Sequence, residues 1–99
     1  MNIVAVTACP TGIAHTYMAA EQLEKTGKSL GHQIKVETQG AMGIENEISA
    51  GEIEAADAVI FAVDIPVEQR ERFDGKRVIE VPVALAIKDP KGVFAKLGQ

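Results

Sequence analysis

Short apolar runs at four places along the chain predict four β-strands. The first and third runs are almost continuously apolar, which is typical of strands that are covered on both faces of a sheet. The second run stops at Gly40 and leads into a glycine-punctuated loop through Met42 and Gly43. The predicted strands cover residues 3–6, 33–38 and 58–63, and the fourth begins near Arg77.

Helical spacing separates these runs in the first half of the chain. Over residues 12–30, apolar or small residues recur every three or four positions, which predicts an amphipathic helix that is closed near Gly31. Ser49 and Glu52 have the spacing of a capping box. That pair predicts a short helix that ends at Ala56.

Two more helical segments are predicted in the last third of the chain. The run VEQRERF, which precedes an Asp-Gly pair, fits two helical turns. Asp89 has the character of an N-cap, with Pro90 in the first turn. These two residues predict a terminal helix that ends at Gly98.

Strands that alternate with helices predict a parallel sheet, because a parallel neighbour is reached only through a crossover. The expected strand order is 2-1-3-4, which with right-handed crossovers places helices on both faces of the sheet. The expected fold class is α/β, as a single-domain, three-layer αβα sandwich with a four-stranded parallel sheet of Rossmann-like form. Such sheets bind ligands at the carboxyl ends of the strands where the strand order reverses, which predicts a site in the loop over residues 8–14.

This loop carries the only cysteine of the chain, within the segment VTACPTGIAHTYMAAE. A loop that leads from a buried strand into a helix directs backbone N–H groups and the positive end of the helix dipole at one point, which suits an anion. The same groups favour a thiolate at Cys9, which predicts a nucleophile toward phosphorus. The predicted phosphate-binding residues are those that follow it: Pro10, Thr11, Gly12, Ile13, Ala14, His15 and Thr16.

The spacing Cys9-x5-His15-Thr16 is similar to the Cys-x5-Arg-Ser/Thr loop of phosphatases that form a phosphocysteine. Histidine replaces the arginine here, and no general-acid loop is evident. We therefore expect a phosphocysteine to persist and to be passed on. An inert buried thiol is the alternative interpretation of Cys9. For His15 the alternatives are an ordinary polar residue at a helix start and direct phosphorylation in place of Cys9.

Composition narrows the possible functions. Ten basic and fourteen acidic residues leave a formal net charge of −4 without a basic cluster, which argues against nucleic-acid binding. No apolar stretch reaches the roughly 20 residues of a membrane span, and no leader precedes the first strand, so we expect a soluble cytoplasmic protein. A single cysteine agrees with a reducing compartment. No metal site is expected, because Cys9, His15 and His32 match no ligand spacing.

The segment ACPTGIAHTYMAAE resembles the active-site segment of the fructose-type enzyme IIB domains of the bacterial phosphoenolpyruvate-dependent sugar phosphotransferase system, or PTS. The runs VETQGAMG, ADAVIFAVD and RFDGKRVIEVP are similar to later segments of that family. The likeness extends over residues 1–99, the length of one IIB domain. It implies a four-stranded parallel sheet with the acceptor, Cys9, at the end of the first strand.

The resemblance also implies the partners of the protein. A phosphohistidine on enzyme IIA would phosphorylate Cys9, and the phosphoryl group would pass to fructose or a fructose-like sugar bound by membrane enzyme IIC. The protein would then be a cytoplasmic phosphotransferase, peripheral to the inner membrane through IIC, without cofactor and expected as a monomer. Two alternatives remain open, an FMN-binding flavodoxin-like module, for which aromatic stacking residues are scarce, and a phosphatase.

Residues near the loop are candidates for the rim of the site. Ile13, Tyr17 and Met18 flank the loop and are candidates for an apolar ring, although Tyr17 also fits a core position. Gln39 and Asp64 end neighbouring strands, so they either border the pocket or belong to turns. An Asp64 that pointed inward would repel phosphate.

The sequence does not decide the roles of three further side chains. Met42 is a candidate for the rim of the pocket. Arg70 and Arg72 lie in the run VEQRERF, and a solvated helix face is the expectation for each.

Overall fold

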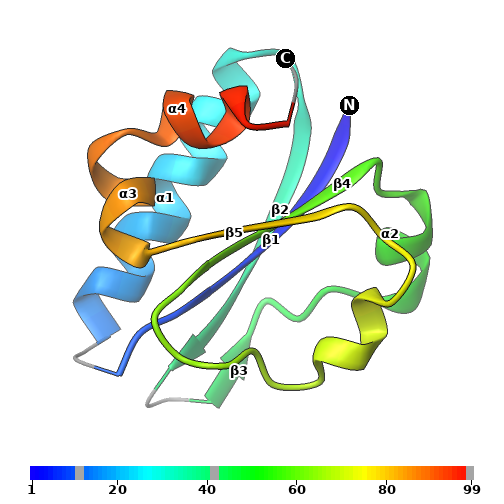
Figure 1. Ribbon diagram of the computed structural model, residues 1–99, viewed down its shortest axis with the longest axis horizontal. Coiled ribbons are helices and arrows are strands. Elements are labelled where there is room, and N and C mark those ends of the chain that lie inside the picture. The colour runs from blue at the N-terminus through cyan, green and yellow to red at the C-terminus, as the bar shows by residue number, and fades with distance from the viewer. Residues whose placement is uncertain (11–12, 41–42, 98–99) are drawn as a thin grey trace.

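A sheet forms the middle layer of the computed structural model, with helices on both of its faces (Figure 1). The structure describes residues 1–10, 13–40 and 43–97. Helices α1, α3 and α4 cover one face, and α2 and the 3-10 helix η1 lie on the other. The elements are β1 (Asn2–Ala8), α1 (Ile13–Ser29), β2 (Gln33–Gly40), β3 (Gly43–Glu45), α2 (Ala50–Ala55), β4 (Ala58–Val63), η1 (Arg70–Phe73), β5 (Val78–Val81), α3 (Val83–Lys88) and α4 (Pro90–Ala95).

The sheet confirms the predicted α/β class and the order of the four parallel strands. Its order is β3-β2-β1-β4-β5, in which β2, β1, β4 and β5 are parallel and stand as 2-1-3-4 was predicted. The order reverses at β1, because its neighbours β2 and β4 are reached by crossovers in opposite directions. The carboxyl end of β1 is therefore the place where such a sheet leaves room for a ligand.

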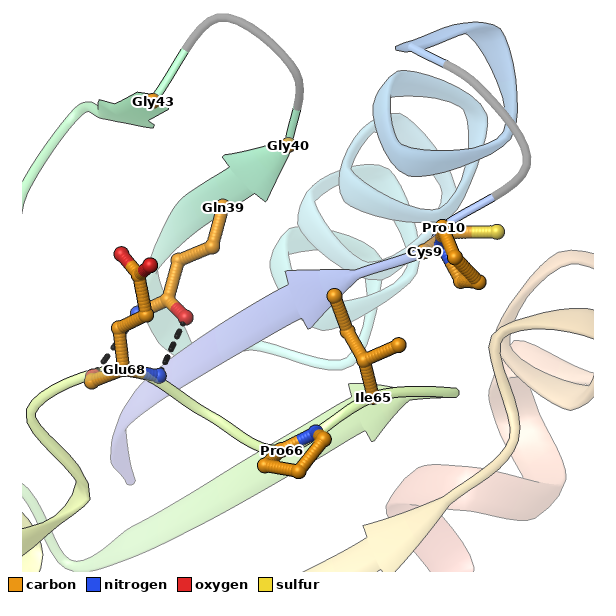
Figure 2. Close-up of a pocket in the computed structure, with 8 residues that line it drawn as sticks. All are labelled: Cys9, Pro10, Gln39, Gly40, Gly43, Ile65, Pro66 and Glu68. Atoms are coloured by element: carbon orange, nitrogen blue, oxygen red, sulfur yellow. Dashed lines mark hydrogen bonds between the residues drawn. The ribbon is translucent and has the colours of Figure 1, made fainter.

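The prediction of four strands was wrong by one, because a fifth strand lies where a loop was expected. Strand β3 is antiparallel to β2, and Gly43 pairs with Gly40 at the tip (Figure 2). Gly43 has a φ of 86°, in the left-handed region that favours glycine. A strand of three residues is too short to show an alternating pattern, so Gly40 and Gly43 indicated only a turn.

Two helical segments also differ from the sequence prediction. Helix α3 was not predicted, because its six residues VALAIK are too short and too uniformly apolar to show a helical period. The run VEQRERF forms only the four-residue η1, since Gln69 before it adopts a left-handed φ of 57°. Asp89 caps α4 as predicted, but α4 ends at Ala95, and the predicted end at Gly98 lies outside the described residues. Within the described ranges, no helix is long and apolar enough to cross a membrane.

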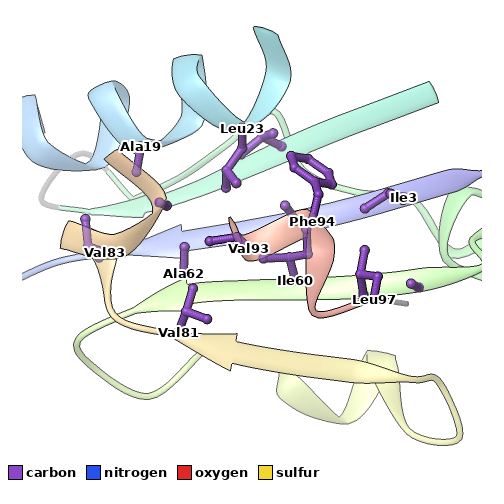
Figure 3. Packing of buried hydrophobic residues seen from close by; sticks show 14 of the residues in the cluster. Ile3, Ala19, Leu23, Ile60, Ala62, Val81, Val83, Val93, Phe94 and Leu97 are labelled. Atoms are coloured by element: carbon purple, nitrogen blue, oxygen red, sulfur yellow. The ribbon is translucent and has the colours of Figure 1, made fainter. Parts of the chain in front are cut away.

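The core consists of two layers because the sheet is buried on both faces. Ile3 and Ala5 of β1 contribute to the layer under α1, α3 and α4, while Val4 and Val6 contribute to the layer under α2 and η1. Figure 3 shows the first layer, where side chains from α1, α3 and α4 converge on the sheet. Cys9 continues the odd-numbered side of β1 and belongs to this first layer.

Replacing Ser49 with alanine is expected to lower the free energy of unfolding by about 1 kcal/mol. The predicted capping box is present, because Ser49 Oγ accepts from the Glu52 N–H at 3.2 Å and Glu52 Oε1 accepts from the Ser49 N–H at 2.8 Å. Urea unfolding measures the loss, with Ser29→Ala at the exposed end of α1 as the control. Equal stabilities of the two variants would contradict the prediction.

Candidate active site

Cys9 lies directly after the carboxyl end of β1, before the start of α1. Its side chain is only 5% exposed, and its Sγ lies 3.7 Å from Oδ2 of Asp64. Helix α1 has no acidic residue in its first turn. The thiol thus lies between the end of a buried strand and the positive end of a 17-residue helix, which stabilises negative charge, while the nearby Asp64 carboxylate opposes it.

Cys9 lines a cavity of about 370 Å³, and Figure 2 shows its sulfur pointing away from Gln39 and Glu68 in the opposite wall. Its wall comes from the ends of β1 and β2, the start of β3 and the loop that follows β4. The lining residues are Cys9, Pro10, Gln39, Gly40, Gly43, Ile65, Pro66 and Glu68. The cavity therefore lies at the carboxyl edge of the sheet, where the strand order predicts a site.

The residues predicted to bind phosphate have different surroundings. Pro10 is exposed and lines the cavity with Cys9, and Ala14 and His15 are exposed in the first turn of α1. Thr16, by contrast, is buried. Two predicted ligands, Thr11 and Gly12, lie outside the described residues, as does the side chain of Ile13.

Thr16 is 2% exposed, and its Oγ1 has no hydrogen-bond partner among the residues that the structure describes. A Cβ added at Gly40 would lie 4.0 Å from this oxygen, so the hydroxyl is near the end of β2. The Thr16 carbonyl accepts from Thr7 Oγ1 at 3.3 Å, which fastens α1 to β1. A buried hydroxyl without a partner is costly, which makes Thr16 a candidate ligand for an anion in the loop.

Gln39 borders the cavity, and its side-chain amide forms hydrogen bonds with the backbone of the opposite wall. Its Oε1 accepts from the Glu68 N–H at 2.8 Å, and its Nε2 donates to the Glu68 carbonyl at 3.1 Å (Figure 2). Nε2 also donates to Oε2 of Glu37 at 2.7 Å. This double hydrogen bond fixes the loop after β4 against the end of β2, so the shape of the cavity is preset.

Glu37 and Arg72 form a buried ion pair behind that wall. Glu37 is 0% exposed and accepts from Nη1 and Nη2 of Arg72 at 3.0 and 2.9 Å and from the Ile48 N–H at 2.9 Å. Burial raises the pKa of Glu37, but the hydrogen bonds from Arg72, Ile48 and Gln39 outweigh it, so the pKa lies below 4.5. The carboxylate is therefore ionised at neutral pH.

The expectation of a solvated face was wrong for Arg72 and right for Arg70. Arg72 is 17% exposed and pairs with the buried Glu37, whereas Arg70 and its partner Glu80 are 56% and 52% exposed. The signal that was missed is Glu37 itself, a carboxylate inside a predicted strand, which needs a cation if that strand is buried.

Asp64 also borders the site, a point that the sequence left open. Its N–H donates to the carbonyl of Ala8 at 2.9 Å, and its Oδ1 accepts from the N–H of Val83 at 3.2 Å. Asp64 therefore supplies from a distance the N-terminal cap of α3 that Pro82 does not provide. Its second oxygen, Oδ2, faces the thiol.

Comparison with known proteins identifies the family. The family model described as "PTS system, Lactose/Cellobiose specific IIB subunit" matches residues 4–96. The chain belongs to the PTS IIB family. Its members act in phosphotransfer, and curated relatives named as fructose-like and fructose-specific confirm the fructose-type resemblance of the sequence.

A "PTS system fructose-like EIIB component 2" of Escherichia coli (strain K12) is 48% identical to this IIB chain, covering 97% of the chain and 91% of that protein. The "PTS system fructose-specific EIIABC component" of Bacillus subtilis (strain 168) is 55% identical over 96% of the chain, which spans only 15% of that protein. Among solved structures, a domain of a fructose-specific IIABC component from Borrelia burgdorferi has a TM-score of 0.91 at 48% identity, covering 95% of this chain and 89% of that one.

Two large side chains of this IIB domain are exposed on the first turns of α1. Tyr17 is 42% exposed and Met18 49% exposed, so Tyr17 does not occupy the core. The Tyr17 hydroxyl donates to Glu45 Oε1 on β3. The hydrogen bond to Glu45, followed by burial and the charge of Glu45, raises the pKa of Tyr17. Ile13 and Met42, the other rim candidates, cannot be placed, because Met42 and the side chain of Ile13 lie outside the described residues.

Proposed function

We propose that this IIB domain, residues 1–99, is a phosphocysteine carrier with Cys9 as its acceptor. The observation that carries the proposal is the position of Cys9 at the carboxyl end of β1, beside the cavity and ahead of α1. A nucleophile in that place meets an incoming phosphoryl group where backbone N–H groups and the helix dipole stabilise its charge. Membership of the IIB family supports the assignment.

The donor is a phosphohistidine on enzyme IIA, and the acceptor is a sugar bound by enzyme IIC. Relatives in which IIB is fused with A and C parts support these partners. The names of the relatives support fructose or a fructose-like sugar. The domain then works at the cytoplasmic side of the membrane that holds IIC.

The residues of the loop act by holding the phosphoryl group during in-line transfer. The N–H groups of residues 11–16 and the hydroxyls of Thr11 and Thr16 donate to its oxygens. His15 stands where phosphatases that form a phosphocysteine have an arginine, so the hydrolytic transition state lacks a bidentate clamp. The phosphocysteine persists until a sugar takes its phosphoryl group.

Tyr17 and Met18 form the exposed apolar margin of this site. Both lie on α1 immediately after the phosphate-binding loop, and both present large apolar surface to a docking protein. A margin of this kind excludes water from the phosphoryl group during transfer. Ile13 completes the margin in this proposal.

The test is to phosphorylate the purified protein with phosphoenolpyruvate, Mg²⁺, enzyme I, the phosphocarrier protein and a cognate IIA, followed by intact-mass analysis. We expect one phosphoryl group that survives mild acid, because an S–P bond is stable where the N–P bond of phosphohistidine is not. An acid-labile adduct would move the acceptor to a histidine. No adduct with a competent IIA would overturn the proposal, and a yellow protein would indicate a flavin module instead.

Thr16→Val is expected to slow phosphoryl acceptance about tenfold or more while leaving stability within about 0.5 kcal/mol of wild type. The reason is that the Thr16 hydroxyl has no protein partner to lose within the described residues. Thr7→Val is the matched control, a buried threonine whose hydroxyl does donate, to the Thr16 carbonyl. Thr7→Val should lower the unfolding free energy by about 1 kcal/mol. Normal phosphorylation of Thr16→Val would remove Thr16 from the phosphate ligands.

A further inference from the structure

Asp64 is held beside Cys9 at three points. It is the first residue after β4, and its backbone N–H donates to Ala8, the residue before the thiol, at 2.9 Å. One carboxylate oxygen accepts from the Val83 N–H at 3.2 Å, and the other lies 3.7 Å from the Cys9 sulfur. The carboxylate therefore cannot turn away from the sulfur without uncapping α3.

We propose that Asp64 is a positioning residue that drives the phosphoryl group off Cys9 by favouring the unphosphorylated thiol over the phosphocysteine. This inference rests on the proposed function, because it assumes that Cys9 carries the phosphoryl group. It concerns the equilibrium of transfer, not the identity of the acceptor.

The argument follows the hydrogen bond between the two side chains through the reaction. In the resting protein the thiol S–H donates to Asp64 Oδ2. In the transfer, the N–P bond of the donor phosphohistidine breaks and the Sγ–P bond forms. The single proton lost by the thiol ends on the donor imidazole nitrogen that has released phosphorus, so the proton count balances. The sulfur of the phosphocysteine has no hydrogen left to donate.

Once Cys9 is phosphorylated, the Asp64 carboxylate can only accept hydrogen bonds, and the sulfur beside it no longer has a hydrogen to donate. An ionised carboxylate has no proton to donate, and the phosphoryl group next to it is also anionic, so a favourable contact is replaced by repulsion between like charges. Passing the phosphoryl group to a sugar restores the thiol and its hydrogen bond. Because Asp64 is exposed, solvent screens the repulsion, and we expect an effect of about tenfold on the equilibrium.

The loop donors and Asp64 thus act in opposite directions on the same group. The donors at the start of α1 stabilise the phosphoryl group as it arrives, and the carboxylate at the end of β4 makes its departure favourable. A carrier needs this balance, since a phosphocysteine that was too stable would keep its phosphoryl group.

The experiment measures how phosphoryl groups distribute between phosphorylated IIA and this protein at equilibrium, by intact mass, for wild type and Asp64→Asn. The amide keeps an oxygen for the Val83 N–H, removes the charge and supplies an N–H that can face the phosphoryl oxygens. Asp57→Asn is the matched control. Asp57 immediately precedes β4, is exposed and accepts from the Asn2 N–H at 2.8 Å, but it lies at the opposite end of the strand.

We expect Asp64→Asn to shift the distribution about tenfold toward the phosphocysteine, with Asp57→Asn unchanged. Added salt should move the wild-type distribution toward that of Asp64→Asn and leave the ratio of Asp57→Asn to wild type constant, which a purely structural role of Asp64 would not produce. If Asp64→Asn loses stability relative to Asp57→Asn, the salt titration of the wild type decides.

Two failures can be told apart. A wild-type distribution equal to that of Asp64→Asn at every salt concentration overturns the role of Asp64 and leaves the carrier function intact. A wild type that takes no phosphoryl group, or a Cys9→Ser variant that takes it equally well, overturns the proposed function itself.

Discussion

Cys9→Ser is expected to abolish phosphoryl acceptance from IIA, by at least about 1,000-fold in rate. The serine hydroxyl has nearly the shape of the thiol but holds its proton far more tightly, so it provides no comparable nucleophile. Cys9 is small and lies at the edge of the first core layer, so the fold should persist. Phosphorylation followed by intact mass gives the rate, and urea unfolding verifies that the variant is folded.

His15→Gln and His32→Gln are the controls for this prediction. Both should still accept a phosphoryl group on Cys9, because His15 is exposed on α1 and His32 packs against Phe94 on α4 with its Nδ1 near the N-terminal amino group. An acid-labile adduct that persists in Cys9→Ser and disappears in one histidine variant would instead identify that histidine as the acceptor.

Arg72→Met is expected to produce the largest loss of stability, about 3 kcal/mol in the free energy of unfolding at neutral pH. The substitution leaves the fully buried Glu37 carboxylate without its cation, although Ile48 and Gln39 still donate to it. The position of Glu68 is also affected, because Gln39 joins Glu37 to that residue. Chemical denaturation measures the loss.

Arg70→Met is the matched control for Arg72→Met. Each arginine lies over a phenylalanine ring, Arg70 over Phe61 at 5.0 Å and Arg72 over Phe73 at 4.9 Å. They differ in that the carboxylate partner of Arg70 is exposed. Exposed pairs contribute little, so Arg70→Met should cost about 1 kcal/mol or less. Similar losses in the two variants would show that the rings, not the buried carboxylate, account for the effect.

The pH dependence of the free energy of unfolding provides a second test of the Glu37–Arg72 ion pair. The pKa of Glu37 is lower in the folded protein than its usual 4.5, so its contribution is complete above that value and is lost as the pH falls through the folded pKa. In Arg72→Met the buried charge opposes folding, and protonation relieves it. The stability difference between wild type and Arg72→Met should therefore narrow as the pH falls from about 7 to below 4. Adding Glu37→Gln to Arg72→Met should recover part of the loss at neutral pH.

Much of the architecture could be predicted because patterns among neighbouring residues determine it. The continuous apolar run at residues 58–63 contains β-branched and aromatic side chains, which favour a strand, and the capping pair Ser49 and Glu52 specifies a helix start within four residues. Parallel pairing then follows from chain connectivity, because a parallel neighbour is reached only through a crossover. The position of Cys9 directly after the first apolar run indicated where the candidate site lies.

The features that escaped prediction are those that depend on distant partners. Strand β3 exists because β2 offers an edge, and α3 begins where Asp64, nineteen positions earlier, caps it. Nothing near Arg72 in the sequence indicates that it will be drawn inward by Glu37, thirty-five positions away.

The sequence by itself therefore determined the fold class, the order of the four parallel strands and the family, and it predicted Cys9 as the nucleophile, since each of these rests on the spacing of neighbouring residues. Only the tertiary structure decided what surrounds that nucleophile: the wall fixed by Gln39 and Glu68, and the carboxylate of Asp64 beside the thiol. The physical reason is that hydrophobic period reports which side of an element is buried. It does not report which charged or polar groups from remote parts of the chain will meet when that side is covered.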